Sequence, residues 1–322
     1  MVRVERLLDR PIVMPDSHPS IGKNIQGPSL IRVPDWIPDA LGRYYLYFAD
    51  HKGSYIRLAY ADDLHGPWNI HPPGSLHLRD SLFPTEPPEA TEEEIASFAA
   101  MRSLTGKRAH SPHEEASTPH IASPDVHVNE KDRRIVMYFH GLEAYGKQLT
   151  RVAISADGIT FNTQPEALGR TYFRVFECGG YHYALAMPGQ LYRSRSGFTD
   201  FETGPRLFNE DMRHTAVLVR GDTLNVFWTQ VGFAPESILL STIDLTGDWL
   251  HWRESEPIEV LRPEFDWEGA DAPLEPSIRS TAYGHVNQLR DPAVYEEDGS
   301  VYLLYAVAGE SGIAIARVEL DS

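Results

Sequence analysis

At 322 residues, with 42% hydrophobic and 23% charged residues, the chain has the composition of a folded protein with a sizeable core, not of a disordered one. A formal net charge of -17 without any cluster of Lys and Arg disfavours binding to nucleic acids or anionic membranes, so a small neutral or cationic ligand fits the charge better. The single cysteine, Cys178, excludes an internal disulfide.

The N-terminal residues 1–14 are interrupted by charges every few positions. They therefore lack the apolar stretch of a signal peptide, and no later stretch is long enough to span a membrane. The sequence predicts a cytoplasmic protein. Residues 2–8, "VRVERLL", have the alternation of an edge strand.

Five similar units follow, and each contains three short runs of alternating aromatic and β-branched residues separated by Gly or Asp turns. This pattern is typical of strands joined by hairpins. The first runs of the units are 28–33, 124–128, 172–180, 214–222 and 291–299, the second are 43–53, 133–141, 181–189, 224–232 and 301–309, and the third are 55–63, 149–158, 191–197, 238–247 and 312–320.

Four of the units add a short fourth strand, for example at 68–71 and 249–252. The fifth unit runs out of chain, and residues 2–8 could supply its missing edge. Units begin about every 45 residues where no insertion intervenes, which is near the length of a propeller blade. We therefore expect an all-β fold, a five-bladed β-propeller of four-stranded antiparallel blades that forms a single domain over 1–322. A β-sandwich with many hairpins is the alternative.

Two insertions, at about 71–118 and 254–285, lie between the outer strand of one unit and the inner strand of the next. The first contains a predicted helix at 91–101, where Thr91 and Glu94 have the spacing of a capping box. In a propeller, both insertions lie on the face where the inner strands begin. We expect the functional site on this face, narrowed by the insertions into a pocket.

Polar and charged residues gather at the predicted starts of the inner strands and at the connections between second and third strands. Buried there, such groups cost several kcal/mol unless they are paired or solvated, so they predict a polar central funnel. Arg290 and Asp291 are expected at its mouth. The candidates are Asn24, Gln26, His51, Lys52, His120, Asp125, His140, Glu143, Arg170, Thr171, Gln190, Arg213, His214, Glu236, His285, Arg290, Asp291 and Glu310.

Cleavage of a glycosidic bond requires two carboxyl groups, one to protonate the leaving oxygen and one to activate water or attack carbon. Asp125, Asp291 and Glu236 could supply them, because they come from separate units and point to one axis. A carboxyl group beside like charges, or in a poorly solvated pocket, has a raised pKa and can act as an acid. His214 could replace it, since histidine titrates near neutral pH.

A metal site is a second interpretation of the 14 histidines. His120, His214 and His285 could bind a transition metal together, although they lack the spacing of a local metal motif. A single histidine, for which His285 is the candidate, could instead hold a hydrated divalent cation such as Ca²⁺ in the central channel. The acid–base chemistry itself requires no cofactor.

The motifs "GPSLIRV", "SPDV" and "RDPAVY" resemble those of the five-bladed glycoside hydrolases of the family 43, 32, 62 and 117 type. The resemblance covers nearly the whole chain as architecture and implies hydrolysis of furanosides or related glycans. In the family 43 pattern, the Pro-Asp-Val motif implies that Asp125 tunes a pKa and orients the substrate. The family 32 Arg-Asp-Pro motif implies that Asp291 stabilises the transition state, although it lies in a different blade.

Two of the three family 43 carboxylates are missing from this sequence. The general base before Pro-Ser is replaced by Gly27, and the Glu-Gly-Pro acid motif is absent, with Arg170 and Thr171 near its position. The resemblance therefore implies either that the acid and base have moved to other residues or that the standard hydrolysis is lost.

The sequence thus predicts an enzyme that cleaves a terminal sugar. Asp125 would position the substrate, Asp291 would act as base, and Glu236 or His214 as acid. Tyr172 could stack on a sugar ring, although core packing is its commoner use. A carbohydrate-binding propeller without catalysis, a metal-dependent enzyme of another class and a homodimer stay open. The residues expected to contact the sugar are Gln26, His51, His120, His140, Arg213 and Arg290.

Overall fold

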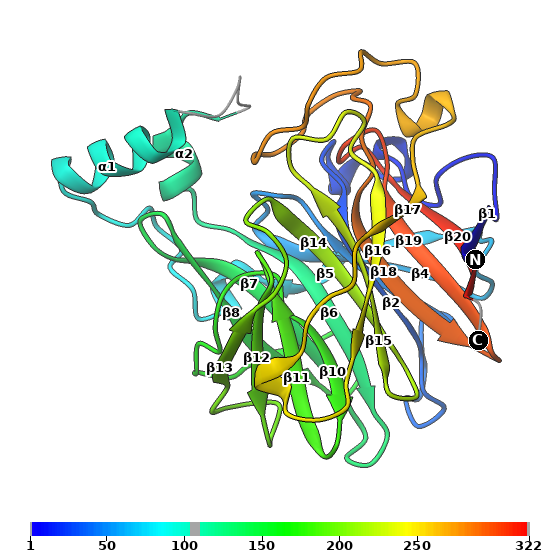
Figure 1. The fold of residues 1–322 in the computed structure, drawn as a ribbon. Coiled ribbons are helices and arrows are strands. Elements are labelled where there is room, and N and C mark those ends of the chain that lie inside the picture. Colours follow the sequence, from blue (N-terminus) through cyan, green and yellow to red (C-terminus); the bar gives the residue numbers. More distant parts are fainter. Residues whose placement is uncertain (1, 104–109, 321–322) are drawn as a thin grey trace.

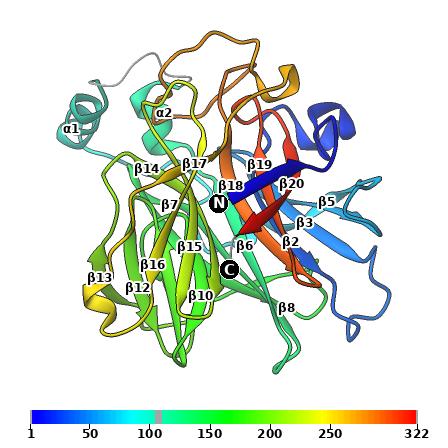
Figure 2. The same cartoon turned by 45° about the vertical axis from the view of Figure 1, so that its right-hand side comes forward.

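Five four-stranded antiparallel sheets are arranged around a central axis in the computed structural model, which describes residues 2–103 and 110–320 (Figure 1). Figure 2 shows the same blades from a second direction. The inner strands of neighbouring blades contact one another around the ring. The predicted five-bladed propeller is therefore confirmed.

The strands of each blade run in order from the axis outward. Blade 1 consists of β2 (Gln26–Arg32), β3 (Tyr44–Ala49), β4 (Tyr55–Ala61) and β5 (Asn69–His77), and blade 2 of β6 (Ile121–Asn129), β7 (Arg134–Ala144), β8 (Lys147–Ser155) and β9 (Asn162–Thr163). Blade 3 consists of β10 (Arg174–Cys178), β11 (Tyr181–Ala186), β12 (Gln190–Ser194) and β13 (Glu202–Arg206), and blade 4 of β14 (Met212–Arg220), β15 (Thr223–Gln230), β16 (Ile238–Asp244) and β17 (Ile258–Leu261). Blade 5 consists of β18 (Arg290–Glu297), β19 (Ser300–Ala306), β20 (Ile313–Leu320) and β1 (Val2–Arg6).

The hydrophobic core is divided into five layers, and each layer lies between two neighbouring blades. The strands near the middle of a blade are therefore covered on both faces. For this reason β3, "YYLYFA", is buried at every position and does not alternate between apolar and polar residues. The side chains at the axis, among them Arg213, Arg290 and Asp291, are instead polar or charged.

The N-terminal strand β1 closes the ring and supplies the edge that the fifth unit lacks, as suggested for residues 2–8. It pairs antiparallel with β20, with Val2 opposite Leu320 and Val4 opposite Val318. Arg6 at its end donates to both carboxylate oxygens of Glu268, at 2.8 and 2.9 Å. Glu268 is fully buried, and the Tyr305 hydroxyl donates to it at 2.9 Å. One carboxylate thus joins the N-terminal strand, the second insertion and blade 5.

The first insertion contains two helices, α1 (Glu92–Ser103) and α2 (Pro112–Ser117). The capping box of α1 is confirmed, because the Glu94 amide donates to the Thr91 hydroxyl at 3.2 Å and the Thr91 amide donates to the Glu94 carboxylate at 2.8 Å. The short helix α2 was not predicted, although Ser111 and Glu114 form a second capping box around Pro112. No helix in the described part of the chain is long and apolar enough to cross a membrane.

The fourth strand predicted at 249–252 is wrong. Trp249–His251 is a 3₁₀ turn, capped by the Asp248 carboxylate, which accepts from the Leu250 amide at 3.1 Å. Trp249 and Trp252 both pack on Tyr183 of blade 3, so their spacing serves a turn and not a strand. The true outer strand, β17, lies within the segment that was expected to be insertion.

We expect Glu268→Ala to loosen ring closure. The change leaves the mostly buried Arg6 guanidinium with only its exposed partner Glu264 and removes the acceptor of the buried Tyr305 hydroxyl, which together cost about 3 kcal/mol of the free energy of unfolding. Urea denaturation measures this loss, and hydrogen exchange of the β1 amides locates it. Glu5→Ala, which breaks an exposed pair with Arg317, is the control and should cost less than about 1 kcal/mol. Equal exchange of β1 in both variants would contradict the proposed clamp.

Candidate active site

The five inner strands share an unusual backbone conformation near their first residue. For each strand, one residue within two positions of the first has a positive φ: Gly27 at 62°, Ser123 at 51°, Tyr172 at 66°, His214 at 46° and Asp291 at 49°. In four of the blades the ladder to the next strand is irregular at this point. A positive φ is uncommon for residues other than glycine and marks functional sites when the surrounding structure enforces it. These five residues form what we call the axial ring.

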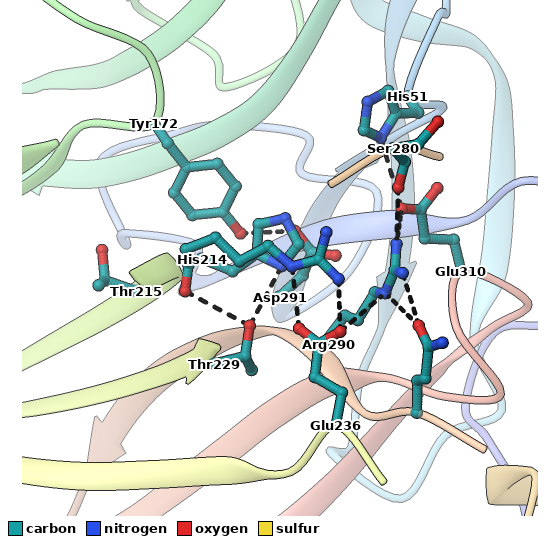
Figure 3. A network of polar contacts seen from close by, with 12 residues as sticks. His51, Tyr172, His214, Thr215, Thr229, Glu236, Ser280, Arg290, Asp291 and Glu310 are labelled. Atoms are coloured by element: carbon teal, nitrogen blue, oxygen red, sulfur yellow. Dashed lines mark hydrogen bonds and ion pairs between the residues drawn. The ribbon is translucent and has the colours of Figure 1, made fainter. Parts of the chain in front are cut away.

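Three members of the axial ring meet at the axis (Figure 3). The Tyr172 hydroxyl donates to Asp291 Oδ1 at 2.6 Å, and His214 Nε2 lies 3.7 Å from the same oxygen. The rings of Tyr172 and His214 are 5.2 Å apart between centroids. The other two members are small, and a Cβ on Gly27 would lie 3.1 Å from the Ser123 Cα. The reactive groups of the ring therefore come from blades 3, 4 and 5.

Asp291 has an unusual environment for a carboxyl group. Burial and the neighbouring charge of Glu310 raise its pKa to about 6, although the Tyr172 hydrogen bond and the Arg290 charge act in the opposite direction. Its Oδ2 is buried and has no hydrogen-bond partner among the described residues. Asp291 can therefore hold a proton in mildly acidic solution, where an ordinary aspartate is ionised.

His214 has the opposite perturbation. Burial, followed by the charges of Arg213 and Arg290, lowers the pKa of His214 well below its usual value. Its Nδ1 lies 3.4 Å from the Thr229 hydroxyl. In mildly acidic solution His214 is therefore a neutral imidazole beside a carboxyl group that can still hold its proton, and the two form an acid–base pair.

Two buried ion pairs lie beside His214 and Asp291. Arg213 binds Glu236 through both carboxylate oxygens, and Arg290 donates to Glu310 at 2.8 Å and lies 3.5 Å from Glu236. Burial would raise the pKa of Glu236, but the charges of the two arginines outweigh it and lower that pKa. For Glu310, burial is outweighed by His51 and Arg290, and the pKa falls to about 2. Both glutamates are therefore ionised counter-ions of the arginines.

A cavity of about 300 Å³ adjoins the acid–base pair. Both insertions lie on this face of the propeller (Figure 1) and meet here, because the Ser280 hydroxyl donates to the Glu115 carboxylate at 2.6 Å. The His110 and Tyr283 rings also touch, with 5.4 Å between centroids. The cavity is lined by His51, Lys52, Glu115, Gly146, Gln148, Arg170, Thr171, Met187, Pro188, Arg213, His214, Arg279 and Ser280.

Most of the residues expected at the axis do gather there. His51, Arg213 and His214 line the cavity, while Glu236, Arg290, Asp291 and Glu310 are buried in the network beside it. Arg290 and Asp291 are only 1% exposed, so their expected position at a wet funnel mouth is wrong. The second insertion covers them, and its Ser280 carbonyl accepts from Arg290 at 3.1 Å.

The expected histidines of blade 2 lie next to the pair but outside the cavity lining. The His140 ring is 6.1 Å from His120 and 6.4 Å from Tyr172 between centroids. Burial, aided by His51 and Lys52, lowers the pKa of His140 to about 3. Burial also lowers the pKa of His120 well below its usual value. Gln26 is buried at the start of β2, next to Gly27.

Asp125 is not brought to the His214 cavity. It lines a separate cavity of about 500 Å³, together with Ala216 and Ala293, which follow His214 and Asp291 along their strands. Its carboxylate accepts from the Val175 amide and pairs with His127 Nε2, both at 2.8 Å. The axial-ring position of blade 2 is Ser123, two residues earlier.

His285 likewise does not line the His214 cavity. Its side chain is 49% exposed and bonded to Asp271 on the second insertion. Within residues 2–103 and 110–320, no group of three or more His, Cys, Asp and Glu side chains that could hold a metal ion is present. The three histidines considered as a metal set are therefore not brought together.

Arg174 is a site residue that the sequence analysis missed. It is buried, its guanidinium lies 4.4 Å from the Tyr172 ring centroid, and it donates to the Pro124 and Thr215 carbonyls at 3.1 and 2.9 Å. It therefore ties blades 2, 3 and 4 together behind Tyr172. A charged residue within the apolar run 172–176 was the available signal.

The chain is similar in sequence to a viral protein and similar in fold to several solved structures. No family model matches the chain. Uncharacterized protein R118 of Acanthamoeba polyphaga mimivirus is 35% identical over 323 residues, which cover 92% of this chain and 83% of that protein.

Among solved structures, the chain is similar to a thermostable family-43 glycoside hydrolase (TM-score 0.55, 12% identity, 92% of this chain and 89% of that one). It is also similar to a GH43 enzyme from Xanthomonas citri (TM-score 0.55, 10% identity, 96% and 88%). A third similar structure is an exo-1,5-α-L-arabinanase from a bovine ruminal metagenomic library (TM-score 0.53, 12% identity, 93% and 94%). The fold is therefore the five-bladed propeller of the family-43 glycoside hydrolases.

We expect Asp291→Asn to remove a pH dependence of stability. Because the folded-state pKa of Asp291 is raised from 3.8 to about 6, its contribution to stability is full below about pH 4 and is lost as the pH rises through 6. Asparagine does not titrate and tolerates a positive φ. The free energy of unfolding of Asp291→Asn minus that of the native protein should therefore rise by about 3 kcal/mol between pH 3 and pH 8.

Denaturation in urea at each pH measures this difference. Asp298→Asn, at an exposed turn that also has a positive φ, is the matched control and should follow the native protein at every pH. A constant difference between Asp291→Asn and the native protein would show that Asp291 is not perturbed.

Proposed function

Because the chain belongs to the same family as uncharacterized protein R118 of Acanthamoeba polyphaga mimivirus and has the fold of the family-43 glycoside hydrolases, we propose that it is a glycoside hydrolase-like enzyme. In this proposal it cleaves the terminal glycosidic bond of a sugar bound in the His214 cavity. The observation that carries the proposal is the pairing of a proton-holding Asp291 with a neutral His214, 3.7 Å apart, at that cavity.

The size and position of the cavity support a terminal sugar as substrate. A volume of about 300 Å³ is at the lower end for small-molecule sites. The contact between the two insertions, from Ser280 to Glu115, closes one side of it. An internal segment of a long glycan would need an open groove, whereas a chain end fits a pocket.

The pKa shifts favour exchanging the roles that the sequence suggests for Asp291 and His214. Asp291 is the proton source, and His214 lines the cavity and faces the sugar. The pair gives one proton to the leaving oxygen as the bond from the anomeric carbon breaks. It takes one proton back from the water that forms the new bond to that carbon, and so ends with the proton it began with. Tyr172 orients Asp291 through its hydroxyl.

The remaining expected residues have supporting roles in this proposal. His51 and Arg213 line the cavity and contact sugar hydroxyl groups. Arg290, Glu236 and Glu310 hold Arg213 and His51 in position through their ion pairs. Glu236 has no proton to donate, because the arginines keep it ionised, so the acid role does not fall to it.

A carbohydrate-binding propeller without catalysis is the second candidate, and two observations favour it. The axial-ring positions of blades 1 and 2 are Gly27 and Ser123, which supply no carboxylate. Asp291 is only 1% exposed, so it reaches a sugar only through His214. A binding protein would retain its affinity for a sugar and release no product.

Release of p-nitrophenol from a panel of furanosides and pyranosides, with each reaction stopped in base, tests the proposal. We expect His214→Ala and Asp291→Asn each to lower kcat about 100-fold or more, since positioned acid–base groups contribute about 10²–10⁴-fold. Activity of the native protein should fall as the pH rises through about 6, because Asp291 loses its proton there.

Glu177→Gln, at an exposed turn on the opposite face, is the control and should keep full activity. Sugar binding without turnover across the panel would favour the binding protein. Full activity of Asp291→Asn would exclude the acid–base pair even if the protein is a hydrolase.

A further inference from the structure

The cavity beside His214 carries a charge opposite to that of the protein. The whole chain has a formal net charge of -17. Four cationic residues nevertheless line this one cavity, and Glu115 is the one carboxylate among its described lining residues. The cations are Lys52, Arg170, Arg213 and Arg279.

The four cations differ in how far they are already compensated. Arg213 is neutralised by Glu236. The Lys52 ammonium donates to the Glu115 backbone carbonyl at 3.1 Å, and Arg279 donates to the Glu210 backbone carbonyl at 2.7 Å and lies 4.0 Å from the Asp211 carboxylate. The side chain of Arg170 is exposed and makes no hydrogen bond or ion pair with the residues that the structure describes. Among the lining residues other than Arg213, three are cationic and one is a carboxylate, and Arg170 is the cation that projects into solvent.

The cavity that contains Asp125 has an excess of acidic residues. Five carboxylates line it, against the two arginines Arg32 and Arg174; the carboxylates are Asp35, Asp125, Glu130, Glu296 and Glu297. The lining of this cavity is acidic, like the protein as a whole, whereas the lining of the His214 cavity has more cationic than acidic residues. The two cavities therefore differ in charge, and the His214 cavity is the one whose lining has an excess of cations.

Gathered cations repel one another, and a concave site concentrates their field on whatever enters it. A neutral sugar offers hydroxyl groups, which do not compensate positive charge. A carboxylate or sulfate oxygen accepts charge-assisted hydrogen bonds, which are about twice as strong as those to neutral groups, and an arginine can bind it through two nitrogens.

We infer that the sugar taken by this cavity carries an anionic substituent, a uronic acid carboxylate or a sulfate ester, which is bound by Arg170 together with Lys52 and Arg279. This inference rests on the proposed sugar-binding function and names its substrate class. The acidic exterior then repels anionic glycans everywhere except at this entrance, so the charge pattern also contributes to selectivity.

Isothermal titration with three disaccharides tests the inference. The probes share one backbone and end in glucose, in glucuronate or in 6-sulfoglucose. We expect one of the anionic probes to bind at least tenfold more tightly than the neutral one, and this advantage to shrink as the salt concentration rises from 50 to 500 mM. Glucuronate and sulfate distinguish the two sources of the anion, and a preference for either supports the inference.

The variant Arg170→Gln should weaken binding of the preferred anionic probe about tenfold and leave the neutral probe unchanged. Arg134→Gln, an exposed arginine at the first hairpin turn of blade 2, is the matched control and should change neither. Because Arg170 is exposed, both variants are expected to fold, and their thermal unfolding verifies this.

Equal affinity for the neutral and both anionic probes would overturn the inference, and so would an anionic preference that Arg170→Gln does not reduce. These outcomes are separate from failure of the proposed hydrolysis. Anionic probes that bind but are not cleaved leave the inference standing and remove the catalytic function. Cleavage of neutral glycosides without any preference for the anionic probes would support the proposed hydrolysis and overturn the inference.

Discussion

The separation of the apolar core into five layers between blades is the constraint on which the rest of the structure depends. The apolar side chains pack between the blades, and the side chains at the axial ends of the inner strands are mainly polar. Buried charges are tolerated only when they are paired, and Arg213, Arg290, Glu236 and Glu310 satisfy one another. Asp291 accepts a hydrogen bond from Tyr172, but this bond and the Arg290 charge do not outweigh burial and the charge of Glu310, which together raise the pKa of Asp291.

Closure of the ring and assembly of the site depend on the same insertion. Its residue Glu268 binds Arg6 of the last strand pair, and its Ile278 and Ser280 carbonyls accept hydrogen bonds from Arg213 and Arg290. The N-terminal strand therefore does more than cover an edge. It anchors the segment that compensates the two axial arginines, which links the stability of the ring to the charge balance of the site.

The sequence predicts the radial fold because every unit repeats the same strands and turns, and radial symmetry then brings Arg213, His214, Glu236, Arg290 and Asp291 together. It failed for Asp125, because the backbone irregularity at Ser123 changes which residue of the strand start faces the ring, and positive φ leaves no mark on a non-glycine residue. It failed at 249–252 because two tryptophans three residues apart fit a turn as well as a strand. The exchange of roles that we propose for His214 and Asp291 rests on pKa shifts caused by burial, and burial is known only from the packed structure.

Net charge is a poor guide to the ligand of this protein, and the reason is the range of electrostatic forces in salt solution. Exposed charges are screened beyond about 8 Å at physiological ionic strength, so the surface carboxylates that produce the value of -17 have little influence inside a cavity. Lys52, Arg170 and Arg279 act there at close range, within a site whose neighbouring glutamates are already bound to other arginines. The overall charge favours a neutral or cationic ligand, whereas the local geometry favours an anion, and the local geometry decides because the ligand is bound by the groups that it touches.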